Sequence, residues 1–474
     1  MNAVPPTLRI GAGLTALVVG LAALSYAFPY GLDVKETPLA LYIGLALILG
    51  GFWACLLRFL GRTEQASGSV LAVLLLGLMM RGAMFLSLPV LEDDSYRYLW
   101  DGAVTANGLD PYTYAPAEAL PSSGPWAEQA SSESDPDLAR LQALAGAHAE
   151  PHSRINYPYV STIYPPLAQA AFAAAHVIDP FGLTGWRLVL LAADLVSFWL
   201  LILLLRENRK DPIWSSLYWW NPVLILQAYG AGHMDLLLVP FLLAALWLAQ
   251  RRKLAASSAA LAGAAAVKLW PVLLFPLLVR PLLRQPIRLV AISVLFVGVL
   301  AIALLPQLLH ALRPEAGLNA YASEWRTHAF LFAIFEDAVF APFEASGTLA
   351  RGFVAMMMLT LTGALTWRYA DQPDRLPVLS AILISALIFL SPTGYPWYLI
   401  WLAPLVVFLP HPGLIALFVL APLYWLRFPF GDDSILYQWG IVPIAFGLPL
   451  LLMAQSFTFR RSDDANRHHY PSPE

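Results

Sequence analysis

Long apolar runs, separated by short polar stretches, follow one another along most of the chain. A helix needs about 20 apolar residues to cross a bilayer, and runs near this length lie at residues 8–28, 39–60, 69–89, 183–205, 213–230, 232–250, 289–309, 347–367, 377–391, 396–410, 413–428 and 436–456. Two further apolar stretches are short or interrupted, at 164–180 and 254–279. Because Lys268, Trp270 and Pro271 interrupt the second, we expect a re-entrant pair of half-helices or two short spans there. The pattern predicts about 11 to 14 transmembrane helices.

Composition agrees with this pattern. Hydrophobic residues make up 59% of the 474 positions and charged residues 12%, whereas soluble domains carry about 25% charged residues. Backbone groups in lipid must pair internally, so we expect an all-α polytopic membrane protein, with 1–474 as one integral membrane domain. The first run is expected to be a span, because no small-x-small cleavage site follows it. A net charge of −3 argues against a nucleic-acid partner.

Basic residues between the apolar runs predict the orientation. They gather at Arg58/Arg62, Arg206/Arg209/Lys210, Arg251/Arg252/Lys253, Arg280/Arg284/Arg288, Arg368/Arg375 and Arg460/Arg461. Loops rich in Lys and Arg stay in the cytoplasm. Placing every cluster there puts both termini inside, including a tail at 457–474. The segments at 29–38, about 90–163, 310–346, 391–396 and 429–434 then face outward.

The large outward segment, about 90–163, is chemically dense at both ends. Glu92 precedes a pair of aspartates, Asp93 and Asp94, at the membrane boundary. A helix from about 93 to 107 would place four side chains on one face: Asp94, Arg97, Tyr98 and Asp101. A carboxylate can accept a proton, a cation can stabilise an anionic leaving group, and aromatic rings can stack on a sugar. The alternative is an ordinary surface ion pair.

Other polar or aromatic positions inside apolar surroundings are candidates for binding. Tyr164 precedes two prolines that favour a helix start, so its ring belongs either to the aromatic belt or to a binding site. His233 and Asp235 lie between two spans, where ionisable groups are paired, functional or exposed at a loop tip. Lys268 must reach water, pair with an acid or meet an anion.

The segment SPTGYPWYLIWL carries Trp397 and Tyr398 at a further outward edge. An interfacial aromatic belt explains them, and so does a wall that faces a sugar or a lipid. The outward loop 310–346 adds Glu324, Trp325, Arg326 and His328, to which the sequence assigns no role.

Taken in order, several strings resemble recurring blocks of the GT-C superfamily, and most of all bacterial polyprenol-phosphate-mannose-dependent glycosyltransferases of family eighty-seven. They are DDSYRYLWDG, NGLDPYTYAP, INYPYVSTIYPPLAQ, GHMD, VKLWP and SPTGYPWY, spread over about residues 90–400. The resemblance does not cover the tail or the first two spans, so residues 1–68 are interpreted as two additional helices.

The resemblance implies a function and a site. The fold would be a GT-C-like helical bundle in the bacterial inner membrane, with its catalytic loop outside. Asp93 or Asp94 would be the base on the acceptor hydroxyl, and the reaction would invert the anomeric carbon. The donor would be a polyprenyl-phosphate sugar, mannose by analogy, and the acceptor an envelope glycolipid or glycan. No cofactor or metal is required, although an Asp-rich loop leaves a divalent cation open.

Two other functions compete with this interpretation. A lipid-linked-glycan polymerase, ligase or flippase is also polytopic with large outward loops, but a flippase needs no carboxylate base at the interface. A secondary transporter would predict inverted repeats and charges at the bilayer midplane. The chain has no evident repeat, and most of its acids lie at the edges of the apolar runs.

Overall fold

The computed structural model describes residues 5–60, 68–119, 135–311, 325–369 and 372–455. In these ranges the protein is all helical, apart from an isolated bridge between Thr327 and Thr393. Eight of the described helical segments are long and apolar enough to cross a membrane: Pro6–Ala27, Leu39–Arg58, Leu183–Glu207, Pro286–His310, Ser346–Arg368, Pro373–Leu390, Pro412–Phe430 and Tyr437–Gln455. The protein is therefore an all-α polytopic membrane protein, as predicted.

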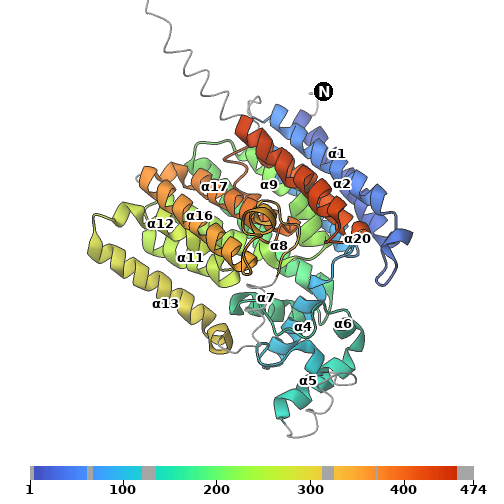
Figure 1. Ribbon diagram of the computed structural model, residues 1–474. Coiled ribbons are helices and arrows are strands. Elements are labelled where there is room, and N and C mark those ends of the chain that lie inside the picture. Colours follow the sequence, from blue (N-terminus) through green and yellow to red (C-terminus); the bar gives the residue numbers. More distant parts are fainter. Residues whose placement is uncertain (1–4, 61–67, 120–134, 312–324, 370–371, 456–474) are drawn as a thin grey trace, which may run out of the picture.

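The long helices form one bundle (Figure 1). Its longer α-helices are α1 (Pro6–Leu24), α2 (Leu39–Ala54), α3 (Gly68–Phe85), α8 (Leu183–Glu207), α10 (Val239–Gln250), α11 (Leu254–Val267), α13 (Pro286–Ala311), α16 (Ser346–Arg368) and α17 (Leu376–Leu390). Shorter elements include α9 (Ser216–Trp219), α12 (Phe275–Val279), α15 (Leu331–Ile334), α18 (Leu399–Leu402), α19 (Pro412–Leu420) and α20 (Arg427–Phe430). The expected 11 to 14 spans are reached only if shorter apolar helices such as α3, α7 (Pro166–Ile178) and α11 also count as spans.

Two of the expected apolar runs, 254–279 and 396–410, are broken, and two runs expected as separate spans, 213–230 and 232–250, meet at a sharp bend. The helical segments Leu224–Gly230 and Met234–Gln250 meet at a bend of 109°. Within the bend Gly232 has a φ of +84°, a backbone conformation that is strained for residues with a side chain. The run at 254–279 breaks at Lys268, between α11 and α12, as expected. The run at 396–410, expected to span, is instead a short helix (α18) that continues as turns to Phe408.

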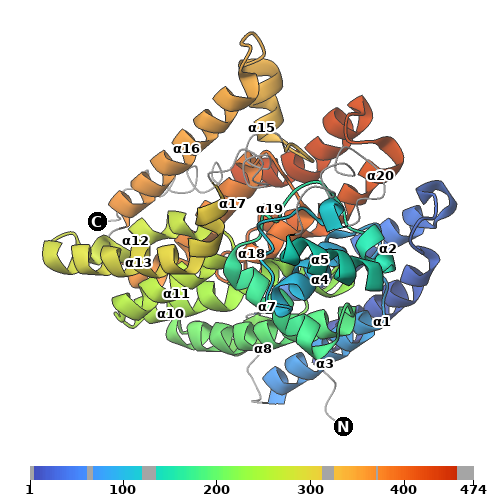
Figure 2. The same ribbon diagram turned by 90° about the horizontal axis from the view of Figure 1, so that it is seen from below.

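An outer layer of short helices covers one end of the bundle. It contains α4 (Asp94–Ala106), α5 (Pro136–Ala147), α6 (Ala149–Ser153) and α7 (Pro166–Ile178). In Figure 1 these helices lie below the bundle, and in Figure 2 α4, α5 and α7 lie over its middle. Helix α4 confirms the predicted helix near 93–107, and α7 begins after Pro165 as the two prolines indicate.

Close packing fixes α4 on α7. A Cβ at Gly102 would lie 2.4 Å from the carbonyl oxygen of Phe172, so only glycine allows this approach. On its other side α4 contributes Trp100 and Val104 to a small apolar core that also includes Leu141 of α5. The outer layer therefore has its own core, and it holds the first turn of α4 against the bundle.

A buried ion pair joins α3 to α8 inside the bundle. Arg81 Nη2 lies 2.7 Å from Asp194 Oδ2, and the two side chains are 1% and 0% exposed. The hydroxyl groups of Tyr218 and Tyr229 donate to the same carboxylate at 2.6 and 2.7 Å. The guanidinium also lies 3.5 Å above the Trp219 ring. Because the opposite charges face each other and Arg81 Nε and Nη1 donate hydrogen bonds to Asp194, Gly77 and Trp219, the pair can exist in an apolar interior.

Candidate active site

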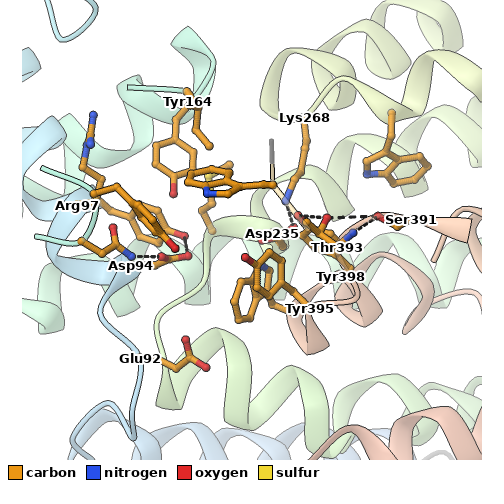
Figure 3. A pocket seen from close by; sticks show the side chains of 18 of the residues that line it. Glu92, Asp94, Arg97, Tyr164, Asp235, Lys268, Ser391, Thr393, Tyr395 and Tyr398 are labelled. Carbon is orange, nitrogen blue, oxygen red and sulfur yellow. Dashed lines mark hydrogen bonds and ion pairs between the residues drawn. The ribbon is translucent and has the colours of Figure 1, made fainter. Parts of the chain in front are cut away.

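A cavity of about 690 Å³ opens where the outer layer meets the broken segments of the bundle. Nine of the eleven candidate site residues line it: Asp93, Asp94, Arg97, Tyr98, Tyr164, Asp235, Lys268, Trp397 and Tyr398; Glu92 also lines it. Figure 3 shows Asp94, Arg97 and Tyr164 on one side and Asp235 and Lys268 on the other. The cavity therefore joins residues that lie more than 300 positions apart in the chain.

Asp94 begins α4 and is held from several directions. Its Oδ1 accepts from Asn156 Nδ2 at 2.6 Å, and its Oδ2 accepts from the Tyr98 hydroxyl at 3.4 Å. His233 Nδ1 lies 3.5 Å from Oδ2. The same Asn156 amide also donates to Asp93 Oδ1 at 2.8 Å. Both aspartates therefore face the cavity in fixed positions, and Asn156 joins them.

The two aspartates have opposite pKa shifts. Burial, together with the neighbouring Asp94 charge, raises the pKa of Asp93 to about 6. Burial also opposes ionisation of Asp94, but the neighbouring His233 and the amide of Asn156 outweigh it and lower its pKa. At neutral pH, Asp94 is the more firmly ionised of the two carboxylates.

Arg97 is the nearest cation on the same helix. Its Nε donates to Asp101 Oδ1 at 2.9 Å and its Nη1 to the carbonyl oxygen of Val160 at 2.9 Å. Its buried Nη2 has no hydrogen-bond partner among the described residues. Asp101 does not line the cavity: it is 2% exposed and accepts from Thr162 and Gln169. The sequence placed Asp101 on the reactive face, whereas in the structure it anchors Arg97.

Lys268 stands at the break after α11, where its backbone is extended. Its Nζ lies 2.7 Å from Asp235 Oδ1, which also accepts from Trp401 Nε1 at 2.7 Å. The ammonium group lies 4.3 Å from the centre of the Tyr398 ring. Lys268 is thus paired with an acid and still faces the cavity, which combines two of the alternatives that the sequence left open.

Aromatic rings form the remaining wall. Tyr395 and Trp397 stack at 4.3 Å, and the opposite face of the site carries Tyr164 against Tyr98 at 5.1 Å. His233 does not line the cavity; it stacks on Trp397 at 3.7 Å behind the aspartates. Flat apolar faces of this kind suit the apolar side of a sugar ring.

The structure adds lining residues that the sequence analysis did not assign. Arg427 pairs with Asp432, and Arg351 donates only to backbone carbonyl groups, those of Gly347 and Trp325, among the described residues. A lone arginine inside or at the end of an apolar run was the available signal for both. Asn156 lies in the block INYPYVSTIYPPLAQ that carries the resemblance, but no role was predicted for it from the sequence. Glu324 lies outside the described residues.

The described residues contain no group of three or more His, Cys, Asp or Glu side chains arranged to hold a metal ion. The expectation that no metal is required, with a divalent cation left open, stays a prediction. The chemistry that this chain's own residues supply is a fixed carboxylate, several cations and an aromatic wall.

Comparisons with known proteins agree on one family. A family model described as "Alpha-(1->6)-mannopyranosyltransferase, N-terminal domain" matches residues 12–133 and 159–284, more than half of the chain. An alpha-(1->6)-mannopyranosyltransferase B from Corynebacterium glutamicum is 29% identical over 211 residues, 42% of this chain and 31% of that protein. The match thus spans about a third of the relative's length. The family match begins at residue 12, so it includes the two N-terminal helices that the sequence blocks left out.

Proposed function

The chain belongs to the alpha-(1→6)-mannopyranosyltransferase family, and on this basis we propose that it transfers mannose from a polyprenyl-phosphate donor to the 6-hydroxyl group of a mannose-containing acceptor. The observation that carries the proposal is the ionised Asp94 at the cavity edge, with Arg97 on the same helix and Lys268 across from it. The acceptor would be a glycolipid or glycan of the cell envelope.

Asp94 is the base in this proposal. It takes the proton of the acceptor hydroxyl as that oxygen attacks the anomeric carbon of the donor. The bond from that carbon to the phosphate oxygen breaks, and polyprenyl phosphate leaves with the electron pair. Attack opposite to the leaving group inverts the configuration, so a β-linked donor gives an α-linked product. Asp93 lies beside the reaction and shares Asn156 with the base.

Cations stabilise the departing phosphate. The Nη2 atom of Arg97 is buried without a hydrogen-bond partner among the described residues, and an anion in the cavity would supply one. Lys268 brings a second charge, close enough that it contributes to the low pKa of Asp94. Phosphate is a fair leaving group, so orienting the donor and acceptor accounts for much of the rate in this proposal.

The proposed orientation places the cavity on the extracytoplasmic side and both termini in the cytoplasm. Three of the basic clusters support it, because the segments that carry them meet at the C-terminal end of α8, whose first turns lie by Gly232 beside the site; Arg62, Arg460 and Arg461 lie outside the described residues. Arg251 pairs with Glu207 at 3.2 Å, and Gln250 donates to the carbonyl oxygen of Pro373. Lys and Arg gather on the cytoplasmic side of membrane proteins.

Cysteine labelling tests this orientation. In a Cys55→Ser background, a cysteine at the exposed Tyr159 should react in intact cells with a maleimide that does not cross membranes. A cysteine at the exposed Arg252 should react only after the cells are permeabilised. The opposite pattern would place the cavity in the cytoplasm and contradict an extracytoplasmic reaction.

The transfer itself is tested with purified protein in proteoliposomes. Radiolabelled polyprenyl-phosphate mannose and a short mannoside acceptor should give a labelled, longer mannoside, and the matching 6-deoxy mannoside should stay unlabelled. If the lipid-linked sugar changes leaflet but no label enters the acceptor, the protein is a flippase. Equal labelling of both acceptors would contradict the proposed linkage.

A further inference from the structure

A buried histidine separates Asp94 from a second carboxyl group, that of Glu92. His233 is 0% exposed, with Nδ1 3.5 Å from Asp94 Oδ2 and Nε2 3.8 Å from Glu92 Oε2. Its ring stacks on Trp397 at 3.7 Å, and the turn behind it is fixed by Trp186, whose Nε1 donates to the carbonyl oxygen of Gly232 at 2.6 Å. The imidazole is thus fixed between two acids on opposite sides.

Glu92 is in a different chemical state from its neighbour. Its side chain is 6% exposed, and its Oε1 has no hydrogen-bond partner among the described residues. Burial raises its pKa well above the usual range, and the negative charges of Asp94 and Asp93 add to this, while Arg427 opposes them. Burial and the two neighbouring carboxylates thus favour the protonated form of Glu92, whose O–H is a hydrogen-bond donor.

We infer that Glu92 and His233 form a positioning pair that fixes Asp94 as the base, with Glu92 acting as a neutral donor rather than as a second carboxylate. This rests on the proposed transfer reaction. Between a carboxylic acid and a carboxylate, an imidazole has one arrangement that satisfies both contacts. Glu92 O–H donates to Nε2, and Nδ1–H therefore points at Asp94.

In this arrangement His233 positions the base and has no part in proton transfer. His233 already carries its proton on the side of Asp94, so it does not take the acceptor's proton. Its Nδ1 faces one oxygen of Asp94 at 3.5 Å, and Asn156 donates to the other; neither ring nitrogen of His233 has a hydrogen-bond partner among the described residues. Both contacts with His233 are long in the unliganded site, and such bonds often shorten only when substrate is bound. Neither His233 nor Glu92 needs to touch the sugar.

Other charged and titratable groups face this cluster and set its pH dependence. Asp94 is faced by His233, Asn156, Tyr98 and Lys268. Glu92 is faced by His233, Asp93, Asp94, Arg427 and Tyr424. The nearby cations Lys268 and Arg427 are unchanged in the variants below, so a shift in pH dependence reports the Glu92–His233 pair.

Two substitutions of Glu92 separate a neutral donor from a carboxylate. Glu92→Leu removes the donor and should lower kcat/KM about 30-fold, whereas Glu92→Gln supplies an amide N–H and should restore it to within about threefold of the wild type. Thermal melting in detergent confirms that both variants are folded. If Gln is as inactive as Leu while both melt like the wild type, Glu92 acts as a carboxylate and the inference is wrong.

His233→Phe keeps the ring that stacks on Trp397 and removes both nitrogens. It should move the acidic limb of the pH profile of kcat/KM upward by about one unit, because Asp94 loses a donor that favours its ionised form. Since Glu92 acts through His233, the double variant with Glu92→Leu should lose no more activity than His233→Phe alone. An unmoved limb or additive losses would overturn the pairing. If the wild type transfers no mannose at all, the proposed function fails first and the pairing with it.

Discussion

Asp94→Asn should lower the rate of mannose transfer about a thousandfold. A general base contributes about 10² to 10⁴ to a rate, and an amide cannot accept the proton of the acceptor hydroxyl. The substitution keeps the size of the side chain and one oxygen that can accept from Asn156. Donor affinity, measured with the labelled lipid, should therefore stay within a few-fold of the wild type. A variant with both full affinity and full kcat would remove Asp94 from the mechanism.

Asp93→Asn is the matched control at the neighbouring aspartate, and its main expected effect is on stability rather than on the rate of transfer. Transfer should fall less than about tenfold, since Asp94 remains as the base. The pKa of Asp93 is raised from 3.8 to about 6, so its ionisation destabilises the folded state above pH 6, and this penalty vanishes as the pH falls toward 4. The variant should thus melt about 2 °C higher at pH 7.5, with a smaller gain at pH 5. Equal gains at both values would contradict the raised pKa.

Arg81→Leu should be the most destabilising single substitution at the ion pair inside the bundle. It leaves the Asp194 carboxylate, 0% exposed, without its cation. Removing one partner of a buried pair costs about 3–5 kcal/mol, which should appear as low yield of folded protein and early melting in detergent. The cost arises from an uncompensated buried charge and not from lost packing alone.

The double variant Arg81→Leu/Asp194→Asn separates these causes. The hydroxyl groups of Tyr218 and Tyr229 donate to different oxygens of Asp194. With both charges removed, one hydroxyl can still donate to the amide oxygen of the asparagine and the other can accept from its N–H, so much of the lost stability should return. Melting temperature and the yield of monodisperse protein are the readouts. A double variant that is less stable than Arg81→Leu alone would show that the charges are not the main cost.

The sequence predicted the elements that are determined by residues close to one another in the chain. Apolar length located most spans, and α4 lies almost where the helix between 93 and 107 was expected, because Gly108 and Pro111 end it. The break at Lys268 followed from a charge and a proline inside an apolar run. The run at 396–410 misled the prediction, because its apolar residues are buried in protein as α18 and turns, and hydropathy alone does not separate this from burial in lipid.

The arrangement of the site depended on contacts that no local pattern encodes. Periodicity placed Asp101 beside Asp94, but Thr162 and Gln169 draw it into a buried network. The sequence left His233 and Asp235 as paired, functional or exposed groups, and both are buried: His233 lies behind the aspartates, and Asp235 lines the cavity and pairs with Lys268. Asn156 joins Asp93 to Asp94 from more than 60 positions away. Only the packing of the outer layer on the bundle brings these groups together.

The most direct test of the account is the stereochemistry of the product. Wild-type protein, given a β-linked polyprenyl-phosphate mannose with a ¹³C label at the anomeric carbon and a mannoside acceptor, should form a new α-linkage at the 6-position, read by NMR. That result would support an inverting transfer in which the carboxylate is the base and the cations stabilise the leaving phosphate. A β-linked product, or a product joined at another hydroxyl group, would contradict it.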